Sequence, residues 1–158
     1  MSRLAPLCVV GALLMAVPAL AQSSMLVGTW KENIAKSKFT PGPAPRARTL
    51  KWEPAAGGLK FTVETLNAQG QTVNTENIER NDGSDGAVQG ADGKPTGTLR
   101  SLKRIDDHTY EDMDKRDGKT MFTRRMVISP DGKTLTITVT GTNAQGQKVS
   151  NVEVFEKQ

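Results

Sequence analysis

The sequence predicts an all-β protein, an antiparallel up-and-down barrel of eight to ten strands. Three observations support this: apolar and polar residues alternate with period two, turn residues recur at short intervals, and no helical period is found after the first 21 residues. In the clearest strand, Leu135, Ile137 and Val139 alternate with threonines, which is typical of a strand with one buried face. The expected strands span 26–32, 47–53, 58–66, 71–79, 97–105, 108–115, 119–129, 134–142 and 147–156, with a weaker strand near 86–89.

The N-terminal segment has the features of a secretory signal peptide. Arg3 provides the positive charge, Leu4–Val17 is apolar, and Ala19-Leu20-Ala21 forms a small-x-small cleavage site. The apolar stretch is shorter than the roughly 20 residues that a membrane span requires. We therefore expect residues 1–21 to be removed and residues 22–158 to form one barrel domain in the periplasm or outside the cell.

Composition excludes several classes of protein. The only cysteine, Cys8, lies in the predicted signal peptide, so we expect no disulfide and no thiolate metal site in the mature chain. The formal net charge is +4, and basic and acidic residues are interspersed, which does not favour nucleic-acid binding. Too few aromatic residues are present for the girdles of an outer-membrane barrel, so we expect no membrane insertion of the mature chain.

An internal repeat divides the domain into two similar halves. Residues 48–73 align without gaps on residues 124–149, with 11 of 26 positions identical, including the shared segment Asn-Ala-Gln-Gly-Gln. Each copy contains a strand, a turn, a strand, a loop and the start of a third strand. The repeat therefore supports a barrel of two similar halves.

The two ends of the mature chain resemble a known family. Leu26–Lys31 contains Gly28-Thr29-Trp30, which resembles the Gly-x-Trp opening strand of lipocalins and fatty-acid-binding proteins, together called calycins. Val152–Lys157 is similar to the terminal strand of fatty-acid-binding proteins, and the whole pattern resembles small exported bacterial proteins described as lipocalin-like. The resemblance implies a barrel that binds a small ligand, with Trp30 as a structural residue at its floor.

The sequence departs from the fatty-acid-binding pattern at two places. Glu153 and Phe155 stand where that group has an Arg-x-Tyr pair for the ligand carboxylate. A proline-rich loop at 41–45 stands where the group has a lid of two helices. The family's ligand anchor therefore does not transfer to this chain.

Two arginines lie on apolar strand faces. Arg48 shares its face with Leu50 and Trp52, and Arg124 shares its face with apolar residues of the equivalent strand, Phe122, Met126 and Ile128. We predict that the ligand-binding residues are Arg48, Trp52, Phe61, Phe122 and Arg124, with the guanidinium groups holding an anionic or amphipathic ligand. The alternative is that both arginines pair with acidic residues or extend to the rim.

Other candidate sites are weaker. His108 follows Asp106-Asp107, but no second histidine or cysteine completes a metal site in the mature chain, and we expect a solvated turn residue there. The acidic segments 112–118 and 81–92 lack the ligand spacing of a calcium loop and are expected to be polar loops. We expect no metal and no cofactor.

The sequence leaves two functional hypotheses open, and a third is less favoured. The first is an exported, non-enzymatic and monomeric barrel that binds a small apolar or amphipathic molecule. The alternative is a periplasmic protein-interaction or inhibitor domain with a solid core, and the third is an enzyme that uses His108. An apolar cavity of about 300 Å³ or more would favour the first.

Overall fold

The structure is a computed structural model of the 158-residue chain, and it describes residues 24–158. The predicted signal peptide, residues 1–21, lies outside the described residues. Apart from one 3-10 turn, η1 (Ile34–Lys36), the regular elements are strands: β1 (Gly28–Glu32), β2 (Ala47–Ala55), β3 (Gly58–Leu66), β4 (Thr72–Glu79), β5 (Asp82–Gly90), β6 (Pro95–Arg104), β7 (Thr109–Arg116), β8 (Lys119–Ile128), β9 (Thr134–Thr142) and β10 (Lys148–Lys157).

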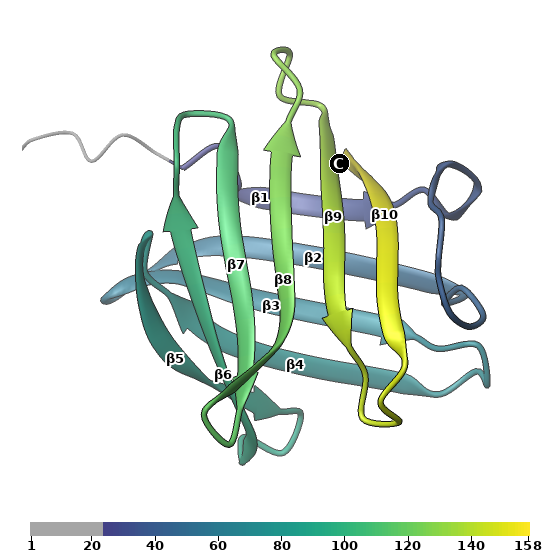
Figure 1. The fold of residues 1–158 in the computed structure, drawn as a ribbon. Helices are drawn as coiled ribbons and strands as arrows, with labels where there is room; N and C mark the ends of the chain where they lie inside the picture. The colour runs from purple at the N-terminus through teal and green to yellow at the C-terminus, as the bar shows by residue number, and fades with distance from the viewer. Residues whose placement is uncertain (1–23) are drawn as a thin grey trace, which may run out of the picture.

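The ten strands form one closed antiparallel barrel in up-and-down order, which confirms the predicted fold class. Each strand pairs with the next along the chain, and β1 pairs with both β2 and β10, so the sheet closes on itself. In Figure 1, β2 to β4 run across the view, and β6 to β10 cross them as a second layer. The neighbouring strands with the fewest paired residues are β4 and β5, which share only the pairs Thr75–Gly90 and Glu76–Gln89.

The alternation of the sequence separates the two faces of the barrel wall. Along β9, Leu135, Ile137 and Val139 are buried, whereas Thr138 and Thr140 are exposed. Because successive side chains of a strand point to opposite faces, the apolar set fills the interior. The main core cluster consists of Leu26, Trp30, Leu50, Trp52, Leu59, Phe61, Leu102, Tyr110, Met126, Ile128, Leu135, Ile137, Val139 and Phe155.

The turns follow the chemistry of the sequence. Between β7 and β8, Asp117 and Gly118 have φ angles of 51° and 72°, the left-handed conformation that an Asp-Gly hairpin turn requires. The loops that begin at Asn67 and Asn143 have the same hydrogen bonds: each asparagine Oδ1 accepts from the backbone N–H four residues later, at 2.9 Å. The sequence repeat therefore corresponds to a structural repeat of β2–β3 on β8–β9.

The segment expected to be a polar loop at 81–92 is instead mostly β5. Only its part near residues 86–89 was predicted, as a weaker strand, because glycines and acidic residues interrupt the alternation. The strand also has two irregularities in its pairing with β6, after Asp82 and after Ala87. The acidic segment at 112–118 likewise begins inside β7 and reaches a turn only at Asp117. Within residues 24–158, no helix has the length and apolar character needed to cross a membrane.

Candidate ligand-binding site

The barrel contains a cavity of about 390 Å³. Its apolar wall comes from side chains of β2, β3, β8, β9 and β10, and the proline-rich loop after η1 lines it as well: Phe39, Pro41, Pro43, Pro45, Leu50, Trp52, Phe61, Val63, Phe122, Met126, Ile137, Val139 and Val149. Its polar wall consists of Arg48, Thr65, Arg100, Asp112, Arg124, Asn151 and Glu153. The cavity thus combines a broad apolar surface with a few charged groups.

All five residues predicted to bind a ligand, Arg48, Trp52, Phe61, Phe122 and Arg124, line this cavity. They come from β2, β3 and β8, and period-two geometry brings them to the same space. Trp30, which was predicted to be a structural residue, is not among the residues that line the cavity. Its side chain is fully buried and donates its indole N–H to the backbone oxygen of Leu26 at 2.8 Å.

The proline-rich loop is held to β10 beside the cavity. Thr40 donates its backbone N–H to Oδ1 of Asn151 at 2.9 Å and accepts the N–H of Ser150 at 2.8 Å. Lys38 forms an isolated antiparallel bridge with Val152. The segment that stands in place of a two-helix lid is therefore an extended strap whose prolines form part of the cavity wall.

Trp52 and Phe61 form an aromatic surface in the cavity wall. Their rings stack with centroids 4.2 Å apart and an interplanar angle of 15°. The indole N–H of Trp52 donates to Oε2 of Glu79 at 2.8 Å, and the side-chain amide of Asn77 donates to the other oxygen of Glu79 at 3.4 Å. These hydrogen bonds fix the orientation of the indole ring.

Arg48 belongs to the first of two charged groups, which we call the Arg48 cluster (Arg48, Glu32, Asn151 and Glu153). Its Nη1 donates to Oε2 of Glu153 at 2.8 Å, and Asn151 donates to the other oxygen of Glu153 at 3.2 Å. Nε of Arg48 lies 3.8 Å from Oε2 of Glu32, whose side chain is fully buried. Neither carboxyl oxygen of Glu32 has a hydrogen-bond partner within the described residues.

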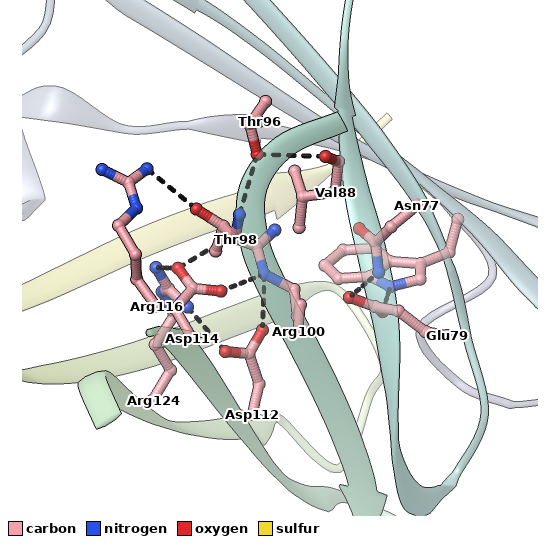
Figure 2. Close-up of polar contacts among 11 residues, drawn as sticks. Asn77, Glu79, Val88, Thr96, Thr98, Arg100, Asp112, Asp114, Arg116 and Arg124 are labelled. Atoms are coloured by element: carbon pink, nitrogen blue, oxygen red, sulfur yellow. Dashed lines mark hydrogen bonds and ion pairs between the residues drawn. The ribbon is translucent and has the colours of Figure 1, made fainter. Parts of the chain in front are cut away.

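The second group, the Asp114 cluster (Arg100, Arg124, Asp112 and Asp114), lies across β6, β7 and β8 (Figure 2). Arg100 binds Asp114 with two hydrogen bonds, of 2.6 and 2.9 Å. Arg124 donates to Asp112 and to Asp114, both at 2.6 Å. Burial alone would raise the pKa of Asp114, but the two guanidinium groups outweigh burial and hold this pKa well below its usual range.

Two buried carboxyl groups have the opposite shift. Burial raises the pKa of Glu32 to about 7, with Arg48 opposing the shift and Glu153 adding to it. Burial and the neighbouring Asp112 raise the pKa of Glu79 to about 7, against the effects of Arg100 and of the hydrogen bonds from Trp52 and Asn77. Both groups are therefore substantially protonated near neutral pH.

The structure selects the paired alternative for both arginines, and sequence reasoning missed their partners. Arg100 shares its strand face with the buried Leu102, and Asp112 and Asp114 share theirs with the buried Tyr110, so the period-two rule applied to Arg48 would have placed them inside as well. Glu153 was noticed only as a departure from a family pattern, although its strand neighbour Phe155 is fully buried on the same face. Charged side chains are mostly exposed in proteins, so the sequence alone did not indicate that these four lie in the interior.

His108 lies away from the cavity lining. His108 is half-buried just before β7, with Nδ1 3.2 Å from the backbone oxygen of Ile128. In residues 24–158, no group of three or more histidine, cysteine, aspartate or glutamate side chains is placed to hold a metal ion.

Comparisons with known proteins place the fold in a known class. No model of a protein family matches the chain, and no curated protein matches it in sequence. Among solved structures, the chain is similar to the zebrafish ileal bile acid-binding protein in complex with cholic acid, with a TM-score of 0.50 and 14% sequence identity over 85% of this chain and 100% of that one. The similarity shows that the two chains share a barrel fold.

Proposed function

We propose that this barrel binds a small amphipathic molecule in its cavity, as a carrier or sensor without enzymatic activity. The observation that carries the proposal is the cavity of about 390 Å³, which exceeds the roughly 300 Å³ at which ligand pockets begin. A solid interior, which the interaction-domain hypothesis requires, does not agree with this space. The solved bile acid-binding barrel, which holds cholic acid, supports the proposal by analogy of fold.

The arrangement of the walls supports an amphipathic ligand. Trp52 and Phe61 offer a flat apolar surface, and the proline-rich strap adds rigid apolar groups near the Arg48 cluster. The charged side chains are hydrogen-bonded to one another, so their positions are fixed before a ligand arrives. Preorganised polar groups in an apolar pocket orient a ligand at little entropic cost.

We also propose that the protein is exported and that the mature chain begins at Gln22. The support is the order of charge, apolar stretch and small-x-small site in residues 1–21. Intact-mass measurement of the protein from its own host, after separation of periplasm and medium, tests this. A mass that includes residues 1–21 in the soluble protein would contradict it.

Native mass spectrometry of protein from the same source tests ligand binding. We expect a bound small molecule that is released on denaturation. The variant Val139→Trp places a large ring in the cavity beside Arg124 and should purify without that molecule, whereas Thr138→Trp, one residue away and exposed, should retain it. An empty wild-type protein, or equal loading of both variants, would contradict the proposed function.

A further inference from the structure

We propose that the cavity selects an uncharged amphipathic molecule that carries hydroxyl or carbonyl oxygens, and that it excludes both carboxylates and amines. This inference rests on the proposed function and specifies its ligand class. Two features of the cavity support it: its charged side chains are paired with one another, and some of their N–H donors remain free.

The guanidinium groups of the cavity wall already have carboxylate partners. Arg48 is bound to Glu153, and Arg100 and Arg124 share Asp112 and Asp114. These carboxylates extend from the barrel's own strands, and the hydrogen bonds to them are between 2.6 and 2.9 Å long. An incoming carboxylate would either displace one of them and leave it buried without a partner, or bind beside it on the same guanidinium group, where the two anions repel each other; both are costly.

Two further acids lie behind the cavity wall. Glu32 is 3.8 Å from Arg48, and Glu79 is held by Trp52, and neither is among the residues that line the cavity. Three guanidinium groups therefore face three carboxylates and two additional carboxyl groups. The charges of the three guanidinium groups are balanced by those of Asp112, Asp114 and Glu153, and an added anion would further oppose the ionisation of Glu32 and Glu79.

An amine is disfavoured by the same arrangement viewed from the cavity. The two acids that line the space, Asp112 and Glu153, already accept hydrogen bonds from Arg124 and Arg48, so an ammonium group would have to compete with a guanidinium group for either of them. Glu32 and Glu79 lie behind these groups, out of contact with a ligand. The arginines also cover aromatic faces, with Arg100 5.4 Å from the Phe61 centroid and Arg124 5.7 Å from the Phe122 centroid, so these faces already interact with cations.

Hydrogen-bond donors remain available to a neutral ligand. Among the described residues, Nη2 of Arg48, Nη1 of Arg100 and Nε of Arg124 take no part in the hydrogen bonds of the two clusters. A guanidinium N–H can donate to a hydroxyl or carbonyl oxygen without breaking an ion pair. The rest of such a ligand would contact Trp52, Phe61 and the proline-rich strap.

Displacement of an uncharged fluorescent probe, N-phenyl-1-naphthylamine, by 1-decanol, decanoate and decylamine at pH 7 tests the inference. These competitors differ in their head group and have nearly the same apolar chain: that of decanoate is one carbon shorter, which accounts for about a fourfold difference and not for tenfold. We expect 1-decanol to compete at concentrations about tenfold lower than either charged competitor, because only the charged head groups disturb the buried ion pairs. Failure of the probe and of all three competitors to bind would overturn the proposed function, whereas probe binding with decanoate or decylamine equal to or better than 1-decanol would overturn the selectivity alone.

A variant that binds decanoate more tightly than the wild type gives a second test, because misfolding cannot increase binding. Glu153→Gln removes the hydrogen-bonded charge partner of Arg48, so the affinity for decanoate relative to 1-decanol should rise about tenfold or more. Asp112→Asn should act in the same direction at Arg124 if the first variant does not fold. Glu156→Gln, on β10 but half-exposed and paired with Lys36, should leave the ratio unchanged. An unchanged ratio in folded Glu153→Gln or Asp112→Asn would overturn the inference.

Discussion

Replacing Glu32 by glutamine should stabilise the protein at high pH and leave it unaltered at low pH. The folded protein holds the pKa of this carboxyl group at about 7, against 4.5 for an ordinary glutamate, because its side chain is fully buried and because Glu153 lies nearby, and these two effects outweigh Arg48. A group whose pKa is raised by folding contributes stability below its unfolded pKa and loses that contribution as pH rises through the folded value. The relevant window therefore extends from pH 4.5 to somewhat above pH 7.

The magnitude follows from the size of the pKa shift. Each unit of difference between folded and unfolded pKa corresponds to about 1.4 kcal/mol, so ionised Glu32 lowers the free energy of unfolding by up to about 3 kcal/mol at pH 8 to 9. Glutamine has nearly the same shape and cannot ionise. Glu32→Gln should thus exceed the wild type by up to about 3 kcal/mol at pH 8 and match it near pH 4.

Urea denaturation followed by tryptophan fluorescence at several pH values between 4 and 9 measures this difference. Glu156→Gln is the matched control, since Lys36 and Asn33 lower the pKa of that exposed carboxyl group and its removal should bring no gain at pH 8. A gap between Glu32→Gln and wild type that is constant across the pH range, or a loss of stability at pH 8, would refute the account of a strained buried carboxyl group.

Two other substitutions test the packing and the ion pairs of the barrel. Asp114→Asn removes the carboxylate shared by Arg100 and Arg124 and should lower the free energy of unfolding by about 3–5 kcal/mol. Asp85→Asn removes the partner of Lys115 at a more exposed position and should lower it by less than about 1 kcal/mol. Equal losses of the two variants in urea denaturation would contradict this. Leu135→Ala empties a fully buried position and should cost about 2–5 kcal/mol, against less than about 1 kcal/mol for the exposed Val127→Ala, and a similar melting temperature for the two variants would show that the core is assigned wrongly.

The wall of the barrel could be predicted from the sequence because period-two alternation is a local signal. Leu135, Ile137 and Val139 indicate their own strand without knowledge of its partners. The same rule correctly placed Arg48 and Arg124 on interior faces. By contrast, β5 was predicted only in part, as a weaker strand near 86–89, since its glycines and irregular pairing leave no clear alternation.

The partners of the arginines could not be predicted in the same way. Arg48 and Glu153 are 105 residues apart, and the sequence alone does not say which of 17 acidic residues closure of the barrel brings to each arginine. Strand order and register decide this, and both depend on the whole sheet. The cavity volume is likewise a property of all walls together, including the proline-rich strap, so the sequence could suggest a cavity and not its size.

If a small molecule occupies the cavity against Trp52, the indole N–H signals of the two tryptophans of the chain report its position directly. In a ¹⁵N-labelled protein, each indole N–H gives one NMR signal, assigned with Trp52→Phe. Titration with 1-decanol should shift the signal of Trp52, which lines the cavity, and leave that of Trp30, which is sealed in the core, nearly unchanged. Two unmoved signals at saturating 1-decanol, or a shift of Trp30 alone, would contradict the account.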